Sequence, residues 1–160
     1  MKIFLTRGLS TEVDPKTFAW AVKYNWYSLS NGGGKFYAAR DVIRNGKKKT
    51  ILLHREILKL RGQPLDGEHE DGNSLNNLIR NLRPATRSQN HANRIKLPDN
   101  KHSKFRGVSL ACNHKSWTAQ ISIDNKKQHL GSFANEQDAA KAYDRAAKSQ
   151  FGKFARLNFQ

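Results

Sequence analysis

The stretch Trp117-Thr-Ala-Gln-Ile-Ser-Ile123 alternates strictly between apolar and polar side chains. Because successive side chains of a β-strand point to opposite faces, this pattern predicts a strand with one buried and one exposed face. Asp124 and Asn125 follow as turn residues, and two further β-rich runs, 126–130 and 104–109, flank the first. We therefore expect three short antiparallel strands.

A helix is expected after these strands. Asn135 is a favourable N-cap, and small apolar side chains then recur at helical spacing as far as Phe151, which is followed by Gly152. Alanine side chains allow a helix to lie close to a sheet. The second part of the chain is thus predicted to be a three-stranded antiparallel sheet packed on one helix.

The chain divides in two upstream of these strands. Residues 95–103 are polar and basic, contain Pro98 and have no helical or strand period, which indicates a linker. We expect one domain over residues 1–94 and another over residues 104–160, in an α+β fold.

The first domain contains a predicted β-hairpin. Two β-rich runs, 35–44 and 48–54, are joined across Asn45-Gly46. This dipeptide most readily supplies the two positive φ angles of a tight hairpin turn.

Downstream of the hairpin the pattern is less regular. Residues 54–60 have the spacing of a short helix. Residues 65–75 are expected to form a loop, and residues 77–93 a turn and a helix capped by Thr86 or Ser88.

The charge balance points to a polyanionic partner. The 160 residues include 29 Lys and Arg against 13 Asp and Glu, a formal net charge of +16. Nucleic acid is the first candidate for such a partner. RNA is the weaker choice, because no aromatic motif for binding single strands is present.

The same composition excludes several other classes of protein. The apolar stretches are too short to span a membrane, and the N-terminus meets a charged residue too early for a secretory signal. The single cysteine, Cys112, permits no internal disulfide and no thiolate-rich structural zinc site, so any metal must bind to O and N ligands. We expect a cytoplasmic protein, such as one made in a phage-infected cell.

One constellation in the first domain carries chemistry: Glu68-His69, Asp71-Gly-Asn73, Asn81-Leu-Arg83 and Gln89-Asn90. Its intervals resemble those of the HNH endonucleases of the phage and intron homing type. The resemblance covers about the first 94 residues. It implies a ββα-metal, or His-Me finger, nuclease fold.

The resemblance implies a role for each of these residues by position. His69 would be the general base, Asn81 its orienting partner, and Glu68 and Asn90 the ligands of one Mg²⁺ or Mn²⁺ ion. Two arginines would bind phosphates, Arg83 and Arg87. The roles fit the reaction, because phosphodiester hydrolysis needs a base that activates water and a cation that neutralises charge on the leaving oxygen.

The sequence departs from this family pattern beside the general base. The family normally has Asp at position 68 and an apolar residue at position 67, where this chain has Glu68 and Gly67. Two functions therefore stay open: a site-specific DNA endonuclease, and a DNA-binding protein or transcriptional regulator with an impaired HNH site. As one active site cuts one strand, we expect a monomer to nick; a dimer is the open alternative.

The second domain resembles the plant Apetala-2/ERF DNA-binding domain. The matching segments are Phe105–Val108, Trp117–Ile121, Leu130–Phe133, Ala139–Ala147 and Leu157–Phe159. In that family the three-stranded sheet enters the major groove of double-stranded DNA, which is wide enough to admit strands.

The resemblance also implies which side chains contact DNA. Arg106, Lys127 and His129 match contacting positions of the family, whereas Ser122 stands where the family has Arg. Three further residues lie on or beside the polar face of the predicted sheet: Lys115, Thr118 and Gln120.

Overall fold

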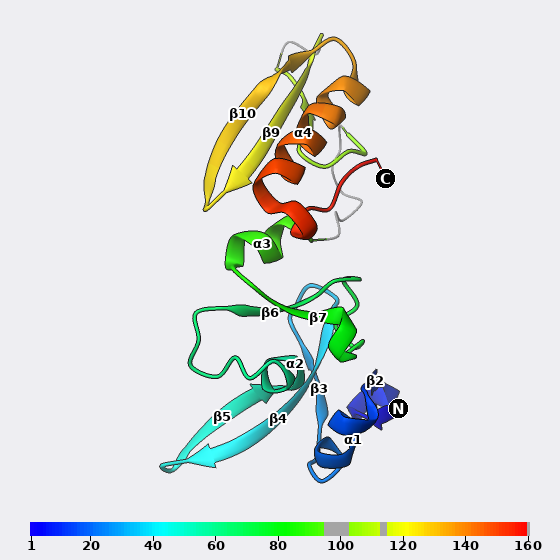
Figure 1. Ribbon diagram of the computed structural model, residues 1–160, viewed down its shortest axis with the longest axis vertical. Coiled ribbons are helices and arrows are strands. Elements are labelled where there is room, and N and C mark those ends of the chain that lie inside the picture. The colour runs from blue at the N-terminus through cyan, green and yellow to red at the C-terminus, as the bar shows by residue number, and fades with distance from the viewer. Residues whose placement is uncertain (95–102, 113–114, 160) are drawn as a thin grey trace. The chain divides into compact units, whose positions relative to one another are not determined.

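The chain forms two compact units, Met1–Thr86 and Arg87–Gln160 (Figure 1). A computed structural model describes residues 1–94, 103–112 and 115–159. Apart from Ser103, the predicted linker 95–103 lies outside the described residues. The positions of the two units relative to one another are not determined.

The first unit contains small antiparallel sheets and short helices. Strands β1 and β2 pair with each other, β3, β4 and β5 form a sheet in that order, and β6 pairs with β7. In chain order the elements are β1 (Lys2–Phe4), the 3-10 turn η1 (Thr6–Gly8), β2 (Ser10–Glu12), α1 (Pro15–Ala21), β3 (Tyr27–Ser30), β4 (Phe36–Arg44), β5 (Lys47–Leu52), α2 (Leu53–Ile57), β6 (Asp66–His69), the 3-10 turn η2 (Ile79–Asn81) and β7 (Leu82–Ala85).

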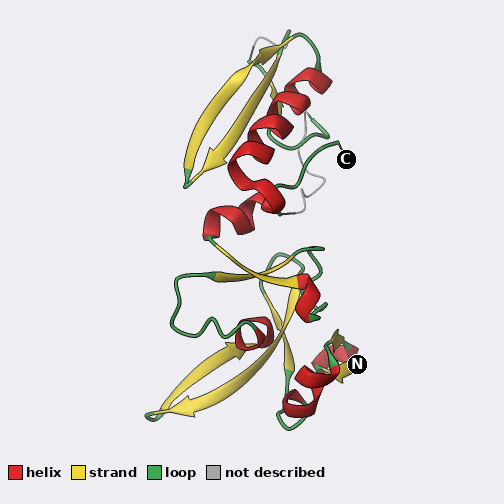
Figure 2. Ribbon diagram, viewed as in Figure 1, coloured by secondary structure: helices red, strands yellow, loops and turns green. Residues whose placement is uncertain are grey.

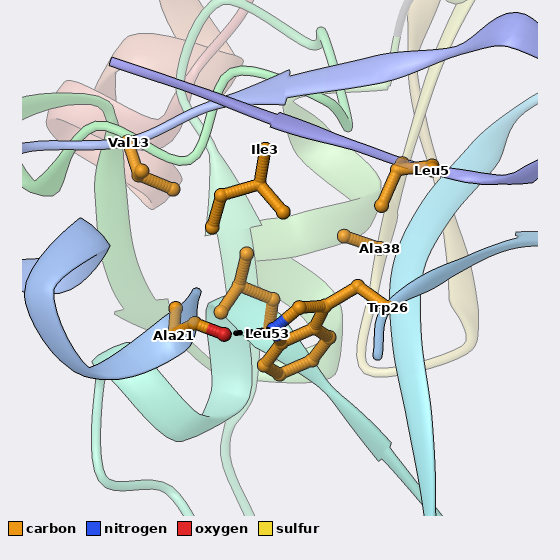
Figure 3. Close-up of a cluster of buried hydrophobic side chains, with 7 residues drawn as sticks. All are labelled: Ile3, Leu5, Val13, Ala21, Trp26, Ala38 and Leu53. Atoms are coloured by element: carbon orange, nitrogen blue, oxygen red, sulfur yellow. Dashed lines mark hydrogen bonds between the residues drawn. The ribbon is translucent and has the colours of Figure 1, made fainter. Parts of the chain in front are cut away.

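The core of this unit ties its N-terminal strands to the rest. Figure 3 shows the converging side chains of the cluster: Ile3, Leu5, Val13, Ala21, Trp26, Ala38 and Leu53. The indole Nε1 of Trp26 donates a hydrogen bond to the carbonyl of Ala21 at 2.8 Å, so its one polar atom is satisfied in the core. This packing holds β2 in place beside the loop that follows β6.

The predicted hairpin across Asn45-Gly46 is confirmed. Strands β4 and β5 are joined by these two residues, with φ of 49° and 70°, and Arg44 pairs with Lys47. Both angles lie in the left-handed region, as a tight hairpin turn requires.

Other local predictions for the first unit need correction. The expected loop 65–75 contains β6, and β7 lies in the expected turn at the start of 77–93; the helix expected there is present as α3 (Arg87–Ala92), which begins directly after Thr86. Strands β6 and β7 are each four residues long, and β6 has the sequence Asp-Gly-Glu-His. Such short segments show too little alternation of apolar and polar residues to be recognised as strands from the sequence. Helix α2 spans Leu53–Ile57 rather than residues 54–60, because the backbone turns at Lys59, whose φ is 55°.

The second unit is a sheet covered on one face by a helix (Figure 2). The strand order is β10-β9-β8 and all pairs are antiparallel. Its elements are α3 (Arg87–Ala92), β8 (Val108–Leu110), β9 (Trp117–Ile123), β10 (Lys126–Phe133), α4 (Glu136–Phe151) and the 3-10 turn η3 (Gly152–Phe154).

The predictions for β9 and α4 are confirmed. The side chain of Asn135 caps α4 by accepting a hydrogen bond from the backbone N–H of Asp138 at 2.8 Å, and the helix ends at Gly152. Strand β8 begins at Val108 rather than at residue 104, since Gly107 has a φ of 70° that breaks the extended run.

The described chain is therefore a mixed α/β protein of antiparallel sheets and few helices, compatible with the α+β class. Among the described residues, no helix is both long and apolar enough to cross a membrane.

Candidate functional site

Strands β6 and β7 carry Glu68, His69 and Arg83, and the fourth predicted nuclease residue of the first unit, Asn81, ends the 3-10 turn η2 just before β7. Glu68 pairs with Arg83 and His69 with Leu82 across the two strands. Glu68 and His69 are consecutive in β6, so their side chains leave opposite faces of the pair. Both are buried, with 2% and 8% of their surface exposed.

The imidazole of His69 ends a chain of buried hydrogen bonds. The hydroxyl of Thr11 donates to the carbonyl of Leu75 at 2.7 Å, and Asn77 Nδ2 donates to that hydroxyl at 2.7 Å. Asn77 therefore presents its Oδ1 to His69 Nε2, 3.2 Å away. An oxygen acceptor at this distance places the ring proton on Nε2 and the lone pair on Nδ1.

Burial keeps His69 neutral. Its removal from water lowers the pKa, and Lys35 adds to this, while the hydrogen bond with Asn77 and the charge of Asp71 oppose it. The net pKa is below the ordinary histidine value. A neutral imidazole with a fixed tautomer can accept a proton.

A second histidine, His54 of α2, packs against the first. The two ring centroids are 5.0 Å apart in an edge-to-face arrangement, and Tyr37 contacts both rings. Burial lowers the pKa of His54 to about 3, with smaller contributions from His69 and Arg55.

The position of His54 explains Gly67. A Cβ atom at residue 67 would lie 2.5 Å from Cδ2 of His54, closer than carbon atoms can approach. Residue 67 is therefore glycine because the buried His54 ring fills the space that a side chain would need.

Asn81 has a different role from the one expected. Its Nδ2 donates to Asp71 Oδ1 at 2.9 Å and to the carbonyl of Asn76 at 2.8 Å, and its Oδ1 accepts from the N–H of Asp71 at 3.1 Å. These bonds occupy the amide, so Asn77 rather than Asn81 binds the His69 ring. Asn81 acts on His69 only indirectly, because it fixes the loop that joins His69 to Asn77.

Asp71 is the centre of that loop. It also accepts hydrogen bonds from the N–H of Asn73 at 2.8 Å and from Asn76 Nδ2 at 2.7 Å. Burial alone would raise the pKa of Asp71, but these hydrogen bonds lower it below the ordinary aspartate value.

Arg83 binds carboxylates of its own unit rather than standing open to phosphates. Its Nε donates to Glu68 Oε2 at 2.5 Å, and its NH1 group lies 3.3 Å from Glu70 Oε1. The Arg83 side chain is only 12% exposed. The expected phosphate contact of Arg83 thus competes with an ion pair to Glu68, the expected metal ligand.

Arg87 and Asn90 lie on α3, which belongs to the second unit. The expected pairing of Asn90 with Glu68 as metal ligands therefore stays a prediction, since the two residues belong to different units. Within the second unit, Arg87 lines a shallow depression with Ser122 and Asp124, next to the turn between β9 and β10.

The sheet of the second unit presents a polar face opposite α4. Cross-strand pairing places Gln120 beside His129 and Ser122 beside Lys127. Directly paired residues share a face, so four sequence-predicted positions lie together with Ser122: Thr118, Gln120, Lys127 and His129. The opposite face, with Ala119 and Val108, packs on the alanines of α4.

A β-bulge in β10 extends this polar face. The pairing shifts between His129 and Gly131, which leaves Leu130 as the extra residue. Without the shift, Phe133 would share the face of Lys127; with it, Ser132 lies opposite Thr118 and Phe133 packs in the core. Lys115 is exposed just before β9.

Hydrogen bonds between the backbone of Arg106 and the side chain of Asn158 fix the position of Arg106. Its N–H donates to Asn158 Oδ1 at 2.6 Å, and Asn158 in turn donates to Asp144. Burial raises the pKa of the Tyr143 hydroxyl, and a hydrogen bond and the charge of Arg106 act against that rise. The guanidinium of Arg106 thus interacts with α4 as well as standing at the edge of the sheet.

Three residues of the site were missed from the sequence: Thr11, His54 and Asn77. A buried Thr in β2 has no local signal, because its partners are more than 60 residues away. Asn77 follows Asn76 in a polar loop, where amide side chains are ordinary turn residues.

Comparisons with known proteins identify two kinds of relative: plant proteins that match part of the chain, and a viral protein that matches most of it. No family model matches. The chain is 45% identical over 64 residues, 39% of its length, to dehydration-responsive element-binding protein 2A of Arabidopsis thaliana, and 42% identical over 60 residues to an AP2-like ethylene-responsive transcription factor of the same plant. It spans about a fifth of the length of the first of these relatives and 11% of the second.

A viral relative matches over most of the chain. An uncharacterized HNH endonuclease of Acanthamoeba polyphaga mimivirus is 30% identical over 158 residues, which are 96% of this chain and 78% of the viral protein. The chain therefore belongs to the family of HNH endonucleases represented by this viral protein.

Proposed function

We propose that the protein is a metal-dependent HNH endonuclease of the homing type that cuts one strand of double-stranded DNA. The observation that carries the proposal is the His69 imidazole, buried and neutral with its Nε2 bound to Asn77. The viral relative, which bears the name of an HNH endonuclease, supports the same reaction class.

In this mechanism Nδ1 of His69 accepts the proton of the attacking water. The Thr11–Asn77 hydrogen-bond chain fixes the ring orientation and tautomer, and Asn81 fixes the loop around Asp71. A base held in place in this way does not need to reorganise when the water approaches.

The donor set suits a hard divalent cation. Glu68 offers carboxylate oxygens, a ligand type that Mg²⁺ and Mn²⁺ accept, and the family resemblance implies the amide oxygen of Asn90 as a second ligand. Such an ion would stabilise the negative charge that develops on the leaving oxygen. Arg83 Nε binds Oε2 of Glu68, so the ion would share this carboxylate with the guanidinium.

The second unit would supply DNA affinity and site selection. Its polar face combines hydrogen-bonding side chains with Lys127, as recognition of base edges and phosphates requires. The plant relatives, which are named dehydration-responsive element-binding proteins, support this assignment.

A second candidate function is DNA binding without cleavage, as in a transcriptional regulator. The Glu68–Arg83 ion pair favours it, because the carboxylate has a counter-charge without any metal. The similarity to plant transcription factors points the same way.

One experiment separates the two functions. Supercoiled plasmid and a mixed duplex library are incubated with the protein and Mg²⁺, Mn²⁺ or a chelator, and the products are assayed for nicked circles and sequenced ends. The endonuclease gives metal-dependent nicks that fall roughly 100-fold or more in His69→Ala. Binding of the library with no nicks under either metal would favour the regulator.

A further inference from the structure

The β4–β5 hairpin carries different charges on its two faces. Because Arg44 pairs with Lys47 and Val42 with Lys49, these residues lie on one face. Asp41, Ile43 and Lys48 alternate with them on the other. Figure 1 shows the hairpin reaching away from the rest of the first unit.

The acidic residue of the hairpin, Asp41, neutralises a cation on only one of these faces. Asp41 lies 2.9 Å from Lys48 Nζ, and it also accepts hydrogen bonds from Thr50 at 2.8 Å and Tyr27 at 3.0 Å. The ion pair and these hydrogen bonds lower the pKa of Asp41, the contact with Lys48 contributing most.

The other face has cations and no acid. Arg44, Lys47 and Lys49 are exposed, and within the part of the chain that the structure describes none of them forms an ion pair. Like charges directly opposite each other in a sheet destabilise it. A repulsive pair at Arg44 and Lys47 costs stability in the free protein and is relieved when an anion binds between them.

We propose that this face, formed by Arg44, Lys47 and Lys49, binds the phosphate backbone of double-stranded DNA. The proposal rests on the proposed DNA-directed function and adds to it a contact in the first unit, separate from the polar sheet of the second.

The geometry suits a run of phosphates. Lys47 and Lys49 are two residues apart on one strand, about 7 Å, and Arg44 faces Lys47 at about 5 Å. The Asn45-Gly46 turn fixes this spacing, since both residues are in the left-handed region that a tight turn needs. Lysines contact phosphates as point charges without reading bases, so the face adds affinity but no sequence preference.

The chain offers a matched control for this proposal. Lys48 lies between Lys47 and Lys49 in sequence but on the opposite face, where Asp41 neutralises it. A triple variant, Arg44→Gln with Lys47→Gln and Lys49→Gln, is compared with Lys48→Gln in the full-length protein. Binding to a fluorescent DNA duplex is measured by anisotropy between about 50 and 300 mM salt, a roughly sixfold range, with a chelator present to prevent cleavage.

The expected result is a change in the salt dependence. Each lost phosphate contact lowers the slope of log K against log salt by about 0.9, so the triple variant loses roughly 2 to 3 units of slope and about 10- to 100-fold in affinity at low salt. Lys48→Gln keeps the wild-type slope to within about half a unit. Melting curves of both variants verify that the first unit is folded, and the triple variant should melt no lower than the wild type.

Other results overturn the proposal. If the triple variant and Lys48→Gln have the same slope as the wild type while the wild type binds DNA, the hairpin face is not a DNA contact although the proposed function stands. If the wild type binds no duplex at all, both fail. A larger loss of affinity for an RNA duplex than for DNA would assign the face to RNA instead.

Discussion

The two units use their polar side chains in opposite ways. In the first unit His69, Asn77, Thr11 and Asn81 are buried and bonded to one another or to the backbone. In the second unit the polar residues of the sheet, such as Lys127 and His129, stand exposed on one face of a small core.

The difference matches what the two surfaces would have to do. A general base works best when its rotamer and tautomer are set before the substrate arrives, which requires a closed network of hydrogen bonds. Side chains that read DNA must exchange their water for base edges and phosphates, so they gain from being exposed. The first unit therefore buries a polar network beside its apolar core, whereas the second exposes the polar side chains of its sheet.

The largest effect is expected in the second unit, at Gly107. A Cβ atom there would lie 2.0 Å from Tyr143 and 2.6 Å from the carbonyl of Gln120, and φ is in the left-handed region. Gly107→Ala should therefore reduce the free energy of unfolding by about 4 kcal/mol, from strain and overpacking together. Urea titration followed by Trp fluorescence measures it. Gly33→Ala, at a site with room and no positive φ, serves as the control. A loss under about 1 kcal/mol contradicts the packing of Gly107 on α4.

A somewhat smaller effect is expected from Arg83→Met in the first unit. It removes the guanidinium that neutralises the buried Glu68 and should cost about 3 kcal/mol, because half of a buried ion pair is left behind. Adding Glu68→Gln to the variant should restore part of the loss.

The same variant tests the metal site. Without the Arg83 charge, Mn²⁺ should raise the melting temperature of the variant more than that of the wild type, since the ion can then take over as counter-charge. Equal shifts in the two proteins would count against Glu68 as a metal ligand.

Features that depend on residues close in sequence were predicted, whereas features that depend on distant residues were not. Strand β9, helix α4 and the Asn45-Gly46 turn follow from local alternation, capping and turn residues, and all three are confirmed. The β-bulge at Leu130 changes the face of every later residue in β10, and no pattern in the sequence marks it.

The site in the first unit depended more on contacts between distant segments. The family resemblance supplied His69 and Glu68, and their positions on β6 are clear. The partner of His69 was misassigned, because the Asn77–Thr11 bond joins residues 66 positions apart, which the backbone hydrogen bonds of Glu12 with Leu75 and Asn77 bring together. The role of His69 as general base remains a prediction. Asn77 and Thr11, which fix its ring, were identified only from the structure.

The pH dependence of stability should distinguish the two units. The pKa of His54 is about 3 in the folded protein against 6.5 for the free side chain. The unfolded chain therefore binds the proton more readily, so this contribution to stability is complete above pH 6.5 and is lost as the pH falls toward 3. By pH 5 the first unit should lose about 2 kcal/mol.

Denaturant titrations at pH 7.5 and pH 5 test this, with His54→Phe as the comparison. A phenylalanine keeps a ring beside Gly67 and removes the titrating group, so the pH dependence should flatten. An unchanged pH dependence in this variant would mean that another group, for example His69, dominates.

The hydrogen-bond chain to His69 is tested by Thr11→Val against Thr11→Ser. Valine fills the same volume without a hydroxyl, which leaves Asn77 and the carbonyl of Leu75 each short of one bond and should cost about 1.5 kcal/mol. In the proposed nuclease it should also slow cleavage roughly tenfold at saturating DNA, whereas serine keeps the rate. A valine variant that is less stable but cleaves at the wild-type rate would make the chain structural only.

The smallest effect on stability is expected on the polar sheet face, at Gln120. Its side chain lies opposite the exposed His129 and takes part in none of the described side-chain hydrogen bonds of the second unit. Gln120→Ala should therefore leave the free energy of unfolding within about 0.5 kcal/mol of the wild type. Its affinity for a selected DNA duplex should fall roughly three- to tenfold, because one base-edge contact is lost. A clear loss of stability with unchanged DNA affinity would reverse the contrast between the two units, since the exposed face would then support the fold rather than the partner.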